Sequence, residues 1–292
     1  MMNTSLVAPT SSKSCQIATL PIELKNQMVN TGTWNPDCPV DLERLRLIKF
    51  PHYDLLGTEQ HGEIVILDAV AARVAIIFET LYLYKFPIAK AITIDHFQGN
   101  DKQSMAANNT SAFNYRPIAG KPVLSVHSYG VAIDVNPIQN PCIAQQDITD
   151  SEEVFVPIQP ADGQAYLNRT NVRPGMVEQP LGTTIGLRVV ELFKQNGFQV
   201  WGGGWNDPVD WQHFQPSRAT AEWLAFMTPK DADILFEIYV TYPTLLNNPK
   251  IRDFDFKTLY EKDRPYFMNV IQKLEFWKLL PEDAYNSIKQ SS

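Results

Sequence analysis

The chain has 292 residues, of which 44% are hydrophobic and 20% charged, and its formal net charge is −7 at pH 7. This composition is typical of a globular protein, and a negative chain without a basic block is not expected to bind nucleic acid. No segment approaches the roughly 18 consecutive apolar residues of a membrane-spanning helix. The length predicts one core of roughly 180–200 residues with extensions at its ends.

Residues 1–33 form a polar N-terminal extension rich in Ser, Thr and Asn. Its first twenty residues hold no run that resembles the apolar centre of a signal peptide. Taken literally, the residues therefore indicate a chain that is not exported.

The first half of the core reads as strands around one long helix. We expect strands at 45–50, 62–67 and 89–95. Between the second and the third strand we expect a helix that is capped by Asp68 and runs to Tyr84. Apolar residues recur along that helix at helical spacing (Val70, Val74, Ile77 and Leu81).

Three histidines lie in this first half of the core. His52 and His61 are interpreted as surface or hydrogen-bonded side chains, and His96, at the end of the third expected strand, is a weaker candidate for lining a cleft.

The region from 136 to 182 is rich in Pro, Gln, Asp and Asn and is interpreted as a long loop with a short hairpin at 154–158. A helix is expected over 185–195, capped by Thr183 or Thr184 and ended by Asn196-Gly197. A strand at 198–201 then leads into three consecutive glycines.

The character of the chain changes after residue 216. Aromatic and aliphatic stripes predict helices at 219–227, 231–242, 255–260 and 263–280. Residues 217–292 are thus expected to form a helical C-terminal extension that packs on the core or presents a partner surface.

The three cysteines, Cys15, Cys38 and Cys142, show no CxxC spacing and build no metal site of their own. An odd number leaves at least one thiol free. Cys38–Cys142 is a candidate pair because both lie in the core region, and three unpaired thiols are the alternative.

The segment from Ser125 to Asp134, with the sequence SVHSYGVAID, is the first of two stretches that carry chemistry. It is interpreted as strand, turn at Gly130 and strand. His127 and Asp134 are seven positions apart and would face opposite ways on one straight strand. A reversal at Gly130 would place them on neighbouring strands, where their side chains converge.

The second stretch is Asp210-Trp-Gln-His213, in a region expected to be a loop. The two stretches together supply two histidines and two carboxylates. A catalytic zinc takes three such ligands and leaves a fourth position to water, and a further carboxylate acts as general base. We assign His127, Asp134 and His213 as ligands and Asp210 as base, although the sequence alone permits the reverse roles for Asp210 and His213.

Taken with a Phe-Asn-Tyr-Arg segment that ends at Arg116 and a downstream Gly-Phe-x-x-Trp-Gly-Gly, these motifs give the chain a family resemblance. Residues 34–216 resemble the zinc D-alanyl-D-alanine carboxypeptidases, a family that also contains L-alanyl-D-glutamate endopeptidases and dipeptidases of the bacterial cell wall. The sequence departs from several members in having Asp210 where they carry Glu.

The resemblance implies a zinc peptidase domain at 34–216 with the fold shared by hedgehog signalling domains. We expect an α+β domain with a central antiparallel sheet and flanking helices. The implied substrate is a peptidoglycan stem peptide, with D-alanyl-D-alanine carboxypeptidase activity favoured over endopeptidase or dipeptidase activity. This substrate implies a periplasmic or secreted protein whose signal was removed, with a cytoplasmic location as the alternative.

The resemblance also suggests a role for Arg116. Arg116 is expected to bind the substrate's terminal carboxylate or the oxyanion that forms on attack. Independently of the resemblance, Ser125 is expected to form a hydrogen bond near His127, with a purely structural role as the alternative. Three aromatic residues are weaker substrate-binding candidates (Tyr129, Trp205 and Trp211).

Two other classes of function remain open at this level. A binding protein would keep the fold and zinc without turnover, and loss of Asp210 or Arg116 would be its usual sign. An adhesion or interaction protein would use the C-terminal helices and bind no stoichiometric metal.

Overall fold

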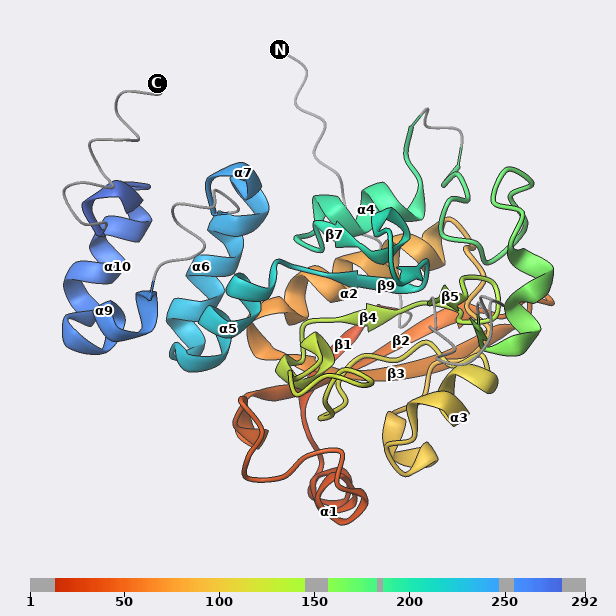
Figure 1. The fold of residues 1–292 in the computed structure, drawn as a ribbon, viewed down its shortest axis with the longest axis horizontal. Helices are drawn as coiled ribbons and strands as arrows, with labels where there is room; N and C mark the ends of the chain where they lie inside the picture. The colour runs from red at the N-terminus through yellow and green to blue at the C-terminus, as the bar shows by residue number, and fades with distance from the viewer. Residues whose placement is uncertain (1–13, 145–156, 183–185, 247–254, 280–292) are drawn as a thin grey trace, which may run out of the picture.

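The computed structural model describes residues 14–144, 157–182, 186–246 and 255–279. In this part of the chain the strands form three antiparallel sheets of three strands each, with helices packed around them (Figure 1). The expectation of an α+β fold is confirmed. The thiols of Cys15, Cys38 and Cys142 are all free, so the Cys38–Cys142 pairing was wrong.

The largest sheet is built at the N-terminal end of the chain. Strand β1 (Gln16–Thr19) pairs with β2 (Leu45–Tyr53), and β2 pairs along its full length with β3 (Glu59–Leu67). Helix α1 (Ile22–Thr31) connects β1 to a short 3-10 turn, η1 (Leu42–Arg44). The strands expected at 45–50 and 62–67 are present and longer than expected.

Helix α2 (Asp68–Leu83) follows β3 directly and packs on β2. Its buried residues recur at helical spacing, as the sequence indicated, because this face covers the sheet. The Asp68 side chain does not act as the N-cap. It accepts hydrogen bonds from the guanidinium of Arg44 at 2.7 and 3.0 Å instead.

The strand expected at 89–95 is absent. The backbone groups here are bonded one at a time: the Ala89 amide donates to Asn136 Oδ1, the Ile92 amide to Asn109 Oδ1, and the Ala91 carbonyl accepts from Glu63. Side-chain partners of this kind satisfy an extended backbone without a strand ladder. The 3-10 turn η2 (Ile94–Phe97) and helix α3 (Asp101–Ala106) follow.

Two small sheets carry the second half of the core. One has the order β4 (Ile133–Asp134), β9 (His213–Gln215), β7 (Val200–Trp201), and the other β6 (Ile158–Gln159), β5 (Cys142–Ile143), β8 (Val209–Asp210). The 3-10 turn η3 (Val126–Tyr129) precedes β4, and η4 (Ala161–Tyr166) and η5 (Gly202–Gly204) lie between later strands of these sheets.

Helix α4 (Val189–Gln195) begins later than expected and ends at Asn196, as expected, with Gly197 at a φ of +91°. Its expected caps, Thr183 and Thr184, lie outside the described residues. Most of the hairpin expected at 154–158 does so too.

The C-terminal region is helical, as the sequence indicated. It contains α5 (Arg218–Phe226), α6 (Pro229–Thr241), α7 (Pro243–Leu246), α9 (Phe256–Lys262) and α10 (Arg264–Gln272). The single helix expected over 263–280 is interrupted, because Leu274 adopts a φ of +59° before the 3-10 turn η6 (Phe276–Leu279). Among the described residues, no helix is both long and apolar enough to cross a membrane.

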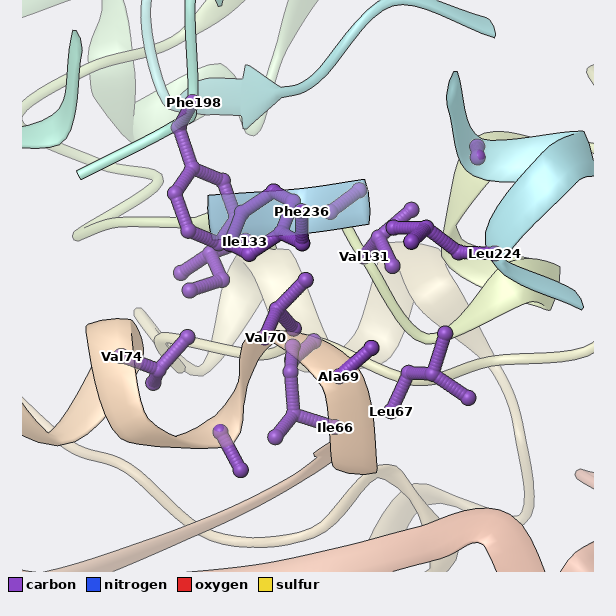
Figure 2. Packing of buried hydrophobic residues seen from close by; sticks show 14 of the residues in the cluster. Ile66, Leu67, Ala69, Val70, Val74, Val131, Ile133, Phe198, Leu224 and Phe236 are labelled. Carbon is purple, nitrogen blue, oxygen red and sulfur yellow. The ribbon is translucent and has the colours of Figure 1, made fainter. Parts of the chain in front are cut away.

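One hydrophobic core joins these parts. Val70 of α2 and Ile133 of β4 belong to the same buried cluster as Phe198, Leu224 of α5 and Phe236 of α6 (Figure 2). Helix α6 packs against α2. The C-terminal helices therefore complete the core that supports β4 and β9.

A buried arginine reinforces this junction. Arg44 is 9% exposed, and its Nη1 donates to the carbonyl oxygens of Leu224, Ala225 and Met227 at 2.7–3.2 Å while the rest of its fork binds Asp68. Arg44 thus ties η1 and α2 to the C-terminal end of α5.

Candidate metal-binding active site

Three side chains from separate elements meet beneath a surface cavity. His127 lies in the 3-10 turn η3, Asp134 on β4 and His213 on β9. In the β4–β9 ladder Asp134 is directly opposite His213, so these two side chains share one face of the sheet. All three are buried, with 2%, 4% and 7% of their surface exposed.

The local structure differs from the expected strand–turn–strand. Ser125 is the N-cap of η3, and its Oγ accepts a hydrogen bond from the His127 amide at 3.4 Å, which favours a turn over a strand. Gly130 ends the turn at a φ of +67°, and an added Cβ there would lie 2.9 Å from the Leu67 nitrogen. The strand beside Asp134 is β9, so the hairpin partnership between His127 and Asp134 was wrong.

The three side chains offer ligand atoms that lie within 4.8 Å of one another. His127 Nε2 is 3.2 Å from Asp134 Oδ2 and 3.2 Å from His213 Nδ1, and His213 Nδ1 is 2.9 Å from Asp134 Oδ1. A tetrahedral zinc with bonds of about 2.0–2.1 Å separates its ligand atoms by about 3.3 Å. The observed spacing therefore fits such a centre closely.

The outward-facing ring nitrogens are already bonded. His127 Nδ1 is 2.5 Å from the Ala112 carbonyl oxygen, and His213 Nε2 is 2.7 Å from Gln215 Oε1. Both acceptors favour a proton on the outer nitrogen, which directs the lone pairs of His127 Nε2 and His213 Nδ1 inward. Two lone pairs and a carboxylate that face one another at this distance require a cation, either a metal ion or a proton.

The pKa values of the cluster reflect the same requirement. Burial alone would raise the pKa of Asp134, but the charges and hydrogen bonds of His127 and His213 hold it far below its usual range. Burial alone would lower the pKa of His213, yet the hydrogen bond and charge of Asp134 raise it to about 9. Without a metal, a proton on His213 therefore occupies the space between these groups.

Asp210 lies beside the cluster and not within it. It is on β8, opposite Cys142 of β5, and lines the same cavity as the three candidate ligands. The residue is half-buried, but its Oδ1 is fully shielded and accepts no hydrogen bond from the protein. Burial and the nearby charge of Asp134 raise the pKa of Asp210 to about 6.

The sequence left the roles of Asp210 and His213 interchangeable. The structure brings His213 into the three-membered cluster and leaves Asp210 with a shielded oxygen at the cavity wall. This arrangement matches the assignment of His213 as ligand and Asp210 as base, which stays a prediction.

The cavity has a volume of about 430 Å³. Arg116 lines it, and its Nη2 lies 2.9 Å from Oδ2 of Asp101, the first residue of α3. The Nε of Arg116 is shielded and has no acceptor. A larger cavity of about 790 Å³ between α5 and α9 includes no histidine among its lining residues.

The weaker candidates separate into two groups. Ser125 and Trp205 line the cavity, and the Trp205 ring centroid is 5.4 Å from that of His213. Tyr129 instead packs half-buried against the core, and Trp211 lies under the guanidinium of Arg169, 4.7 Å from its ring centroid. The structure therefore does not place Tyr129 or Trp211 at the cavity.

His96 does not line this cavity either, contrary to expectation. Its Nδ1 lies 3.2 Å from both the hydroxyl and the carbonyl oxygen of Thr93, and with His61 it borders a different cavity beside β2 and β3. The reason is that the strand expected before it does not form.

Sequence reasoning missed three residues that support the site. Ser128, fully buried, donates to the Arg116 carbonyl and accepts from the Arg116 amide, each at 3.0 Å. Gln215 holds His213, and Asp101 pairs with Arg116. Gln215 was predictable, because it is two positions after His213 and residues two apart on a strand share a face. Nothing in the sequence around Asp101 indicated its pairing with Arg116.

Two imidazoles and a carboxylate lie around one point and could hold a metal ion, and a further carboxylate lines the same cavity. Residues 119–216, about a third of the chain, match the family model described as D-alanyl-D-alanine carboxypeptidase. The match includes the three candidate ligands and Asp210, confirms the family resemblance for this segment and supports a peptidase. Searches of curated proteins and of solved structures returned no match.

Proposed function

We propose that the chain is a zinc-dependent peptidase that hydrolyses peptidoglycan stem peptides, with D-alanyl-D-alanine carboxypeptidase activity as the favoured form. The observation that carries the proposal is the convergence of His127, Asp134 and His213 at 2.9–3.2 Å inside the segment that matches the peptidase family. A periplasmic or secreted location is part of the proposal, because it follows from the substrate.

His127, Asp134 and His213 would hold the zinc ion through Nε2, the carboxylate and Nδ1. When bound in such a site, zinc lowers the pKa of a water molecule and polarises a carbonyl group. Ala112 and Gln215 keep the two imidazoles in the tautomers that binding requires.

Asp210 is the proposed general base. Its Oδ1 lacks a partner in the protein, and the residue lines the cavity, so we propose that this carboxylate accepts a proton from the attacking water. A pKa of about 6 leaves the carboxylate ionised at neutral pH and still able to return the proton to the leaving amine.

Arg116 is proposed to stabilise the carbonyl oxygen as it gains negative charge. Asp101 fixes the guanidinium on one side, and Ser128 fixes the backbone of Arg116 on the other. Arg116 therefore does not need to reorganise during the reaction.

The test is product analysis by mass spectrometry after incubation with pentapeptide-bearing muropeptides. We expect loss of one terminal alanine, abolished by a chelator and restored by zinc. Cleavage deeper in the stem would retain the mechanism and change the substrate assignment to an endopeptidase or dipeptidase. Bound zinc without any cleavage would contradict the proposal and indicate a zinc-containing binding protein.

Two variants separate the proposed roles. His213→Ala is expected to lose zinc, whereas Asp210→Ala is expected to keep zinc and lose turnover, with metal content measured by atomic absorption. The opposite pattern would reverse the two assignments.

A further inference from the structure

The metal cavity has a wall formed by a small hairpin between Arg116 and Ser125. Pro117 and Leu124 form an antiparallel bridge, and the Ile118 amide donates to the Val123 carbonyl at 2.8 Å. Ile118, Ala119 and Lys121 of this hairpin line the cavity together with the candidate ligands.

The hairpin is anchored at both its turn and its base. The Lys121 amide donates to the Ile118 carbonyl at 3.0 Å, and Gly120 provides the φ of +73° that this tight turn needs. At the base, the Ser125 amide donates to the Arg116 carbonyl at 2.9 Å and Arg218 Nη2 to the Leu124 carbonyl at 3.0 Å. The position of Lys121 at the rim is therefore built into the fold.

Three lysine or arginine side chains line the cavity, and two of them are already engaged. Arg116 pairs with Asp101 at 2.9 Å. Arg218 holds the hairpin and lies 3.9 Å from Glu222. Among the described residues, no carboxylate lies within ion-pairing distance of the exposed Lys121 ammonium group.

We propose that Lys121 is a specificity-determining residue that binds the free carboxylate of the peptide substrate, while Arg116 serves the reacting carbonyl. This inference rests on the proposed peptidase function. A second carboxylate at Arg116 would face the charge of Asp101, whereas at Lys121 it would neutralise an unpaired cation.

The size of the cavity agrees with this division. A sphere of 430 Å³ is about 9 Å across, and an extended residue spans about 3.3–3.6 Å, so two to three residues reach from the metal cluster to the rim. The carboxylate recognised by Lys121 thus belongs to the last residues of a peptide chain.

The test uses the zinc-loaded protein and compares two substrates that differ in one group, the same stem peptide with a free C-terminal carboxylate and with a C-terminal amide. We expect the wild-type protein to have the higher kcat/KM for the acid. Lys121→Met should lower the acid-to-amide ratio about fivefold, as expected for loss of one partly exposed ion pair. Lys121→Arg should restore most of it.

Two controls make the result specific. Lys273→Met, which removes an exposed lysine from the end of α10, should leave the ratio unchanged. Arg116→Lys should lower kcat for both peptides to a similar degree and leave their ratio unchanged. An unchanged ratio in Lys121→Met, or a ratio that falls only in Arg116→Lys, would overturn the inference while leaving peptidase activity intact.

Failure of the proposed function has a different signature. If neither peptide is cleaved, the peptidase proposal fails, and binding of the two peptides to the zinc-loaded protein by calorimetry then decides the role of Lys121. A preference for the acid that disappears in Lys121→Met would support it, and equal binding of both peptides would overturn it.

Discussion

Zinc binding should release a proton from His213, because that proton occupies the place of the metal. The pKa of His213 is raised to about 9 in the metal-free protein, since its hydrogen bond and ion pair with Asp134 outweigh burial. At pH 7 the ring is two pH units below this pKa and about 99% protonated. Zinc requires the neutral ring, so about one proton per zinc is released.

Isothermal titration calorimetry in buffers with different ionisation enthalpies measures the number of protons released. We expect about one proton near pH 7 and about half a proton at pH 9, with zinc affinity rising about tenfold per pH unit between 6.5 and 8.5. An ionising water would give the opposite trend, with more protons released as the pH rises.

The matched control is Asp210→Asn, which removes the neighbouring carboxyl group, whose pKa is raised to about 6, and keeps the three ligands. Its proton release near pH 7 should remain close to one. No proton release and a flat affinity between pH 6.5 and 8.5 would refute the reasoning, because His213 would then be neutral before zinc binds.

Three further predictions concern single side chains. Gln215→Leu leaves His213 Nε2 without its acceptor and should weaken zinc binding about 10–100-fold in a chelator competition. Arg44→Met removes the guanidinium that donates to Asp68 and to three carbonyl groups and should lower the free energy of unfolding by about 3 kcal/mol in urea; a loss below 1 kcal/mol would contradict this. The pKa of Asp210 is about 6 in the folded protein, above its usual 3.8, because the fold favours the protonated form. The stability that this preference contributes is fully present below pH 3.8 and is lost as the pH rises through 6. Asp210→Asn should therefore stabilise the metal-free protein by up to about 3 kcal/mol at pH 7 and by little at pH 4, and equal gains at both pH values would contradict it.

Elements with strong local signals were predictable. The period of apolar residues in α2, the Asn196-Gly197 end of α4 and the short apolar run at the end of β3 each report a local preference that the fold retains. The expected strand at 89–95 failed because side chains from Asn109 and Asn136, distant in sequence, supply its hydrogen bonds. Local sequence patterns do not predict such distant partners.

The sequence by itself identified the side chains that we propose carry the chemistry. The SVHSYGVAID and DWQH segments supplied His127, Asp134, Asp210 and His213, because few other residue types bind zinc or accept a proton from water. It also indicated that Arg116 belongs with them.

Only the tertiary structure decided how these groups meet. Strand β9 returns beside β4, which places His213 opposite Asp134 and leaves Asp210 on a separate sheet with a shielded oxygen. It also pairs Arg116 with Asp101 and leaves Lys121, at the rim, without an ion-pair partner among the residues that the structure describes. The pKa values of these groups, and which charges have a partner, depend on distances and burial. Distances and burial arise from contacts between segments that are far apart in the chain.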